Sequence, residues 1–255
     1  MIRNSYFRAI HGMASSLKMQ FFALIYQFSG IPRMVMEAFL RKNFGERHFS
    51  FSLALAIAFI LMAIPVQYLD FGMGQRGNPG LDFLKHYLTW YIFVGVFIWQ
   101  SWKHYQVIQK EKMDGFNYDK SSVYEGDVHP FFFGLRYKGR AVTAFEIECF
   151  IEPAVFLGAG LILAILGQSI GWLFIICSLI YGMSYRALYY AGDIMILDYI
   201  DQKLYNEYLE KAYMNNMHPS ETHGVQFRGR HINNEVTRRE MAPALVDNEK
   251  TYTAR

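Results

Sequence analysis

Three carboxylates stand where a long apolar stretch of the chain begins: Glu146, Glu148 and Glu152. Glu148 and Glu152 are four residues apart, so they share one face of a helix. Ionisable side chains at membrane depth are candidates for binding a cation or carrying a proton, and this makes Glu148 and Glu152 a candidate polar site. The structural alternative is an ion pair, because a turn near Gln168 brings Glu152 level with Arg186. We predict a Glu152–Arg186 ion pair as the main role of both charges.

The chain contains eight histidines, but their positions do not favour haem or metal binding. His86 and His104 lie at the two ends of one apolar stretch, about five helical turns apart. The histidines His218, His223 and His231 lie in a polar tail whose composition does not favour an ordered site. We therefore expect no metal and no cofactor.

Motifs of the common enzyme classes are missing from the sequence: the nucleophile elbow, the phosphate-binding loop and the zinc-protease helix. The two cysteines, Cys149 and Cys177, lie at the edge of one apolar stretch and inside another. Their positions indicate neither a zinc site nor a disulfide framework. We predict no catalytic residue, and the sequence favours a protein that is not an enzyme.

The apolar residues are gathered in blocks that have the length of membrane-spanning helices. Two blocks, about 150–167 and 170–189, meet at a short turn that places them antiparallel. Small residues recur four apart in both blocks, a spacing that lets two helix backbones approach closely. Two further blocks, about 51–69 and 84–102, are joined by a Gly-rich segment. We predict an all-α integral membrane protein with four transmembrane helices in a membrane domain over 49–190.

The N-terminal segment 1–48 has the pattern of helices that lie at a membrane surface. Residues 1–18 combine apolar and basic positions with helical spacing, and the first half of the segment contains no acidic residue. A basic amphipathic helix of this kind binds anionic lipid, so we predict membrane-surface contacts for Arg3, Arg8 and Lys18. A mitochondrial presequence fits the same composition. A surface helix that packs on its own protein is the third interpretation.

A second short helix is expected over 34–44, in the later part of the N-terminal segment. The basic residues Arg33, Arg41 and Lys42 flank it or lie within it. Basic side chains on a short helix next to apolar blocks favour a position at the membrane surface.

Helical spacing continues past the fourth block into 191–215, whereas the following segment 216–255 is polar and mixed in charge. We predict a cytoplasmic helix over 191–215 and a disordered tail over 216–255. An isolated helix of this length gains most of its stability by packing, yet this one keeps apolar residues outside the membrane. We therefore predict that a partner or a second copy contacts Ile194, Leu197, Leu204 and Tyr208.

Lys and Arg are concentrated before the first block, between the second and third blocks, and after the fourth. Positively charged flanks of this kind remain on the cytoplasmic side. We predict that both termini are cytoplasmic in a bacterial inner membrane, with the mitochondrial inner membrane as the alternative. The net charge of +3 is too small to indicate nucleic-acid binding.

These features together favour a non-enzymatic membrane anchor or scaffold subunit of a larger complex, such as a secretion, conjugation or respiratory assembly. Its partners would be the lipid bilayer and either other membrane subunits or further copies of the chain. Two alternatives remain open. One is a small oligomeric transporter or channel with Glu148 and Glu152 lining a path. The other is a lipid-modifying enzyme at the membrane surface.

Overall fold

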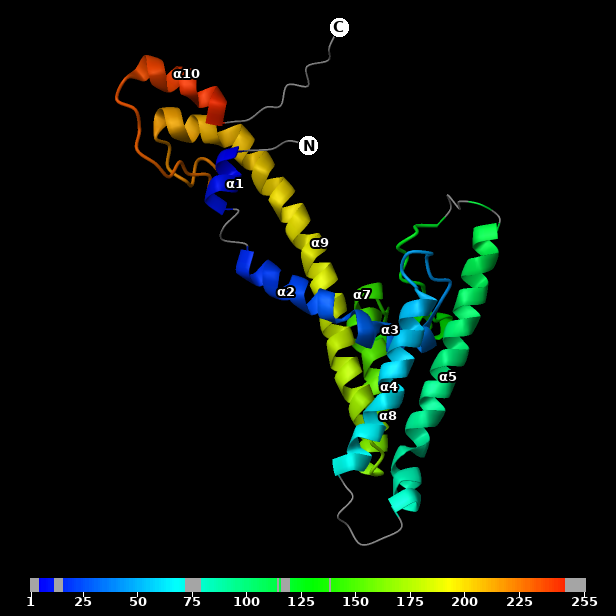
Figure 1. The fold of residues 1–255 in the computed structure, drawn as a ribbon. Coiled ribbons are helices and arrows are strands. Elements are labelled where there is room, and N and C mark those ends of the chain that lie inside the picture. The colour runs from blue at the N-terminus through cyan, green and yellow to red at the C-terminus, as the bar shows by residue number, and fades with distance from the viewer. Residues whose placement is uncertain are drawn as a thin grey trace. The chain divides into compact units, whose positions relative to one another are not determined.

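The computed structural model describes residues 5–11, 16–71, 79–113, 115, 120–137 and 139–245, and these are mostly helices joined by short connections. The predicted helical class is therefore confirmed for the described chain. The chain divides into two compact units, one made of residues 25–187 and one made of residues 1–24 together with 188–255. Figure 1 labels most of the helices of both units.

The larger unit contains a hairpin of two long helices, α4 (Phe51–Phe71) and α5 (Pro79–Met113). The two run side by side (Figure 1), with Trp90 donating a 2.7 Å hydrogen bond from its indole Nε1 to the carbonyl oxygen of Leu61. Helix α3 (Gly30–Leu40) packs against both of them. Helix α5 extends to Met113, well past the predicted end of its apolar block near residue 102.

The second hairpin begins at α7 (Ala144–Glu146), where Thr143 and Glu146 form a reciprocal capping box that starts the helix. A turn of π-helix, η1 (Ile147–Ile151), follows, and α8 (Glu152–Ile165) continues in the same direction. The chain then turns into α9 (Ile170–Asn215), which is one unbroken helix. Gly160 and Gly171 make the hairpin close, since a Cβ on Gly171 would lie 2.6 Å from the carbonyl oxygen of Gly160.

Two helical stretches of the described chain are long and apolar enough to cross a membrane, Ala144–Ile165 and Ile170–Asn215. A third apolar stretch, Phe51–Pro65, is shorter. Both predicted blocks of the second hairpin therefore coincide with helices of membrane-spanning length.

The connection between the two hairpins is ordered by two short antiparallel ladders. Strand β1 (Arg41–Lys42) pairs with β2 (Asp127–Val128), so Arg41 lies opposite Val128. Helix α6 (Pro130–Phe133) follows, and β3 (Arg136–Tyr137) then pairs with β4 (Arg140–Ala141). The first ladder fixes the chain just after α3 against the middle connection.

The smaller unit is built on the second half of α9. Helix α1 (Ser5–His11) packs on it through Phe7, whose ring centroid lies 5.2 Å from that of Tyr205. Helix α2 (Ser16–Phe28) begins in this unit, and α10 (Glu235–Leu245) completes it. Within the predicted helix over 1–18, the described residues belong to α1 and to the start of α2, and residues 1–4 and 12–15 lie outside the described part.

The predicted disordered tail 216–255 is wrong as far as residue 245, beyond which the chain is not described. Val225 is buried against Leu209 of α9, and the ring of Phe227 packs on Tyr213 at 4.6 Å between centroids. The average composition of the tail is polar, but its few apolar side chains meet the apolar stripe of α9. Because each buried apolar side chain stabilises the fold, a handful of well-placed contacts orders a segment that is largely polar.

This packing predicts that Leu209→Ala will expose the tail to proteases. Removing a buried leucine side chain costs about 2–5 kcal/mol, enough to loosen the segment that covers it. Limited proteolysis of the intact protein should cut segment 216–245 several-fold faster in the variant. Leu197→Ala is the matched control, because Leu197 is exposed. Equal cutting rates in Leu209→Ala and the unaltered protein would show that the tail does not depend on this contact.

Candidate functional site

A row of charged side chains lies along one face of α3 and into β1. Arg33 and Glu37 are four residues apart and share one face of α3, and Arg41 follows directly after the helix, at the start of β1. All three are buried, with exposed fractions between 2 and 4 %. Buried charges are tolerated when each has partners, and the partners here come from the second hairpin and the middle connection.

Arg41 connects the row to the second hairpin. Its Nη2 donates to Glu148 Oε1 at 3.1 Å and to Glu152 Oε2 at 2.8 Å. The hydroxyl of Tyr181 donates to the same Glu152 oxygen at 2.5 Å. Glu148 and Glu152, the predicted polar pair, are thus brought together on one guanidinium group. Both this guanidinium and the Glu152 carboxylate are almost entirely removed from solvent.

Arg33 forms the other half of the cluster. Its Nε donates to Glu37 Oε1 at 2.9 Å, and its Nη2 lies 2.7 Å from Glu125 Oε1. The hydroxyl of Tyr185 donates to Glu37 at 2.9 Å. The Tyr185 ring lies under both guanidinium groups, 4.5 Å from Arg33 and 4.6 Å from Arg41, a cation–π arrangement.

Glu37 has a further partner in His48, whose Nε2 lies 2.8 Å from Glu37 Oε2. Burial raises the pKa of Glu37, but the hydrogen bond to His48 and the charge of Arg33 outweigh burial and lower it to about 2. Burial lowers the pKa of the Arg33 guanidinium, and Glu37 and the other acidic groups beside it more than compensate, so that pKa is raised. Glu37 and Arg33 therefore form a charged pair at neutral pH.

Among the residues that the structure describes, Nε of Arg41 and Oε1 of Glu152 are buried and have no hydrogen-bond partner. Buried polar atoms in folded proteins nearly always form a hydrogen bond. A donor and an acceptor that form none are therefore unusual on two side chains that already hydrogen-bond each other through other atoms. The cluster can act as a clamp between α3, α8 and α9, and Oε1 of Glu152 is a buried position at which a proton or a small polar molecule can bind.

The predicted ion pair between Glu152 and Arg186 is wrong, because Glu152 bonds to Arg41 and Tyr181 instead. Arg186 follows Tyr185 by one residue, which turns its side chain about 100° around the helix. Its guanidinium lies 4.4 Å from the centroid of the Phe150 ring.

Arg33 and Arg41 are buried in the protein and are not exposed as membrane-surface contacts, whereas the position of their segment at the membrane surface stays a prediction. The short helix expected over 34–44 ends earlier, because α3 stops at Leu40 and Arg41 begins β1. The extended backbone of β1 turns Arg41 toward the second hairpin, where its carboxylate partners lie.

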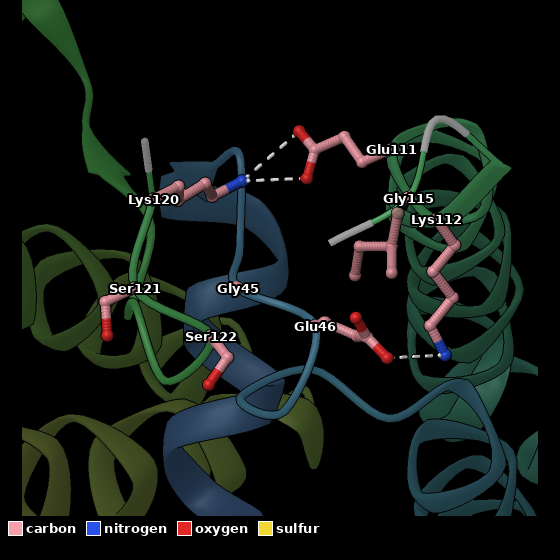
Figure 2. Close-up of a pocket in the computed structure, with 9 residues that line it drawn as sticks. Gly45, Glu46, Glu111, Lys112, Gly115, Lys120, Ser121 and Ser122 are labelled. Carbon is pink, nitrogen blue, oxygen red and sulfur yellow. Dashed lines mark hydrogen bonds and ion pairs between the residues drawn. The ribbon is translucent and has the colours of Figure 1, made fainter. Parts of the chain in front are cut away.

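A small pocket of about 70 Å³, lined by Glu111, Lys112 and Lys120 among others, lies beside the loop that carries His48. Figure 2 shows Lys120 pointing toward Glu111 and Lys112 toward Glu46, with ion-pair distances of 3.2 and 2.9 Å. Gly45 has room for no side chain, since a Cβ there would collide with the backbone of the middle connection. These contacts hold the loop in place, which in turn positions His48 beside Glu37.

Of the three residues predicted to contact the membrane surface, the structure describes the side chain of Lys18 alone. Arg3 lies outside the described residues, and for Arg8 only the backbone is described. Lys18 places its Nζ 4.2 Å from the centroid of the Tyr190 ring.

The predicted partner contacts on α9 fall into two groups. Leu204 and Tyr208 pack partly against Leu209 and Val225 of the same chain. Leu197 is exposed and Ile194 is half-buried. The chain's own tail therefore packs around Leu204 and Tyr208 and leaves Leu197 exposed.

Histidines and cysteines do not gather into a metal site in the described part of the chain, where no group of three or more metal-binding side chains occurs. His104 is buried, and its Nε2 lies 2.8 Å from the carbonyl oxygen of Ala38. Burial lowers the pKa of His104, which favours the neutral form. This histidine therefore joins α5 to α3.

Comparison with protein-family models, with curated proteins and with solved structures found no match. The function must therefore be inferred from the geometry of the chain itself.

Sequence reasoning misses most of the cluster, although a signal for it exists. Three helices each carry a polar pair four residues apart: Arg33 and Glu37, Glu148 and Glu152, and Tyr181 and Tyr185. Each pair defines one face of its helix. The signal indicates that three faces need polar partners. It does not indicate which faces meet, and Glu125 and His48 lie in loops without any such pattern.

We predict that Arg41→Met and Glu152→Leu will each destabilise the protein strongly, because each removes one member of a buried ion pair and leaves the other buried charge. The expected loss is about 3–5 kcal/mol for either single change. The double variant should lose less than the sum of the two. Thermal unfolding in mild detergent measures this, with Arg47→Met at an exposed position as the matched control. Strictly additive losses would show that the two side chains are not coupled.

The lowered pKa of Glu37 predicts a loss of stability in acid. Its folded-state pKa of about 2 lies below its ordinary value of 4.5, so the stabilisation is fully present above pH 4.5 and declines as the pH falls toward 2. The unaltered protein should exceed Glu37→Gln in stability by roughly 3 kcal/mol at neutral pH, and the difference should shrink in acid. Glu210→Gln, at an exposed position of α9, is the control. A difference that is independent of pH would contradict the assignment.

Proposed function

We propose that this chain is a membrane-embedded anchor or scaffold subunit, without catalysis of its own, in a larger membrane assembly. The observation that carries the proposal is a group of exposed apolar side chains on α9 beyond its membrane-length apolar part. Met195, Ile196, Leu197, Tyr199 and Ile200 are each between 46 and 68 % exposed. Acidic residues lie among them, so this part of the helix is not suited to the bilayer core.

Water is a poor environment for such a group, because contiguous exposed apolar surface usually marks a binding site. The tail of the same chain covers the next part of α9, around Leu204 and Tyr208, and leaves 195–200 uncovered. A helix from another subunit or from a second copy supplies the missing apolar cover. The anchor function follows, because one continuous helix then carries both a membrane span and a docking surface.

The four-span arrangement is part of the proposal. Helix α4 and helix α5 both expose large apolar side chains: Leu53, Leu55, Phe59 and Ile60 on the first, and Leu88, Ile92, Val96 and Trp99 on the second. Exposed apolar side chains in such number on both helices are costly in water and are favourable in contact with lipid tails. This supports membrane insertion of the first hairpin as well as the second.

The distribution of Lys and Arg along the sequence supports an orientation with both termini on the cytoplasmic side of a bacterial inner membrane. The mitochondrial inner membrane remains the alternative. The start of α2 supports contact with the lipid surface, since Phe21 and Leu24 are exposed apolar side chains beside Lys18.

A second candidate function, a small oligomeric transporter, is favoured by one specific feature. Glu152 carries a buried carboxylate oxygen that no described residue hydrogen-bonds, and its neighbour Glu148 is partly exposed. A proton could pass between such groups. Proton flux into liposomes that contain only this chain, lost in Glu152→Gln, would favour the transporter over the anchor.

The anchor proposal predicts that Leu197→Asp combined with Ile200→Asp will abolish co-purification of partner subunits, or self-association, in mild detergent. Charges on this surface would have to be desolvated in the interface, which costs several kcal/mol. Size-exclusion chromatography with mass detection measures the size of the assembly. Val236→Asp is the control, because Val236 is an exposed apolar residue on α10. An assembly of unchanged size would remove the main support for the proposal.

A further inference from the structure

A groove of about 210 Å³ runs along the surface between α8 and the first half of α9. Its walls are apolar for most of its length and include Pro153, Ala154 and Leu157 from one helix and Leu179, Gly182 and Met183 from the other. The hydroxyl of Ser178 also reaches the groove, but it donates to the carbonyl oxygen of Pro153 at 2.6 Å. The wall therefore offers an apolar channel suited to hydrocarbon.

Arg186 lies at one end of this groove. The side chain is exposed, and within the described residues it forms no ion pair with a carboxylate. Its guanidinium lies instead over the face of the Phe150 ring. A guanidinium held in this way keeps N–H donors available for an anion, and its planar fork is well matched to a phosphate.

The groove is polarised along its length. Cys149, Phe150 and Arg186 lie at one end, whereas Leu157 and Leu179 lie at the other, about 12 Å away by helical rise. The charged end is the end far from the turn between α8 and α9. In a membrane-spanning hairpin that end lies at the bilayer surface, at the level of the lipid headgroups.

We propose that this groove binds one anionic glycerophospholipid, with its phosphate on Arg186 and an acyl chain along the apolar wall. The inference rests on the proposed membrane location of the hairpin. A single cation at the headgroup level and an apolar channel leading inward match the two chemical halves of such a molecule. Free phosphate lacks the acyl chain and matches only the charged end.

The test uses the full-length protein in mild detergent, with phosphatidylglycerol added and bound lipid counted by native mass spectrometry. The unaltered protein should retain one phosphatidylglycerol. Arg186→Gln should weaken retention about tenfold, the value of one charge-assisted contact, whereas Arg186→Lys should retain most of the binding. Ala154→Leu should fill the groove from its exposed wall and weaken binding with the cation intact. Inorganic phosphate should not compete.

Two matched controls lie outside the groove: Ala56→Leu at an exposed position of α4, and Arg136→Gln at an exposed arginine of β3. Both should retain lipid like the unaltered protein. If Arg186→Gln and Ala154→Leu retained as much phosphatidylglycerol as the unaltered protein, the inference would be overturned. Competition by inorganic phosphate would also overturn it.

Carbonate extraction of membranes separates the proposed membrane location from the proposed lipid site. A chain that stays in the membrane but shows no Arg186 dependence refutes the lipid site alone, whereas a chain that is extracted refutes the membrane location and the lipid site with it.

Discussion

The contact between Arg41 and the two glutamates of the second hairpin is the interaction on which the larger unit depends. One guanidinium group, almost entirely buried, bonds Glu148 and Glu152 and lies over the Tyr185 ring. A charge in such a place is stable only if every partner is held in position. The arginine belongs to neither hairpin, so its contacts join the chain after α3 to η1, to α8 and to the first half of α9.

The remaining parts of this unit are arranged around that contact. The ladder of β1 and β2 holds Arg41 opposite Val128 and brings the middle connection against α3. Glu125 of that connection reaches Arg33, and the loop after β1 returns His48 to Glu37. The polar cluster is thus closed by residues from loops. These loop residues give Arg33 and Glu37 ion-pair and hydrogen-bond partners that an isolated pair of helices would not provide.

Much of the architecture follows from periodicity in the sequence, and much of the cluster does not. The second hairpin, its turn and the unbroken continuation of α9 are local features, because length, apolarity and small-residue spacing determine them. The pairing of Glu152 is not local. Depth matching along the hairpin places it near Arg186, but the rotation of each side chain about the helix axis and a partner from outside the hairpin, Arg41 of β1, decide the outcome. The tail shows the same limit, since Val225 and Phe227 are few in a polar segment and only their placement against α9 orders it.

The π-helical turn from Ile147 to Ile151 rotates the residues of α7, which precede it, about the helix axis relative to those of α8, which follow it. In a regular α-helix, side chains three or four residues apart lie on the same face along the whole helix. A turn closed by i→i+5 hydrogen bonds contains one additional residue, so the residues before it are rotated relative to those after it. The capping residues Thr143 and Glu146 can therefore remain accessible while Ile147 and Glu152 are buried. The turn therefore sets the rotation between the capping box before it and the buried Glu152 directly after it.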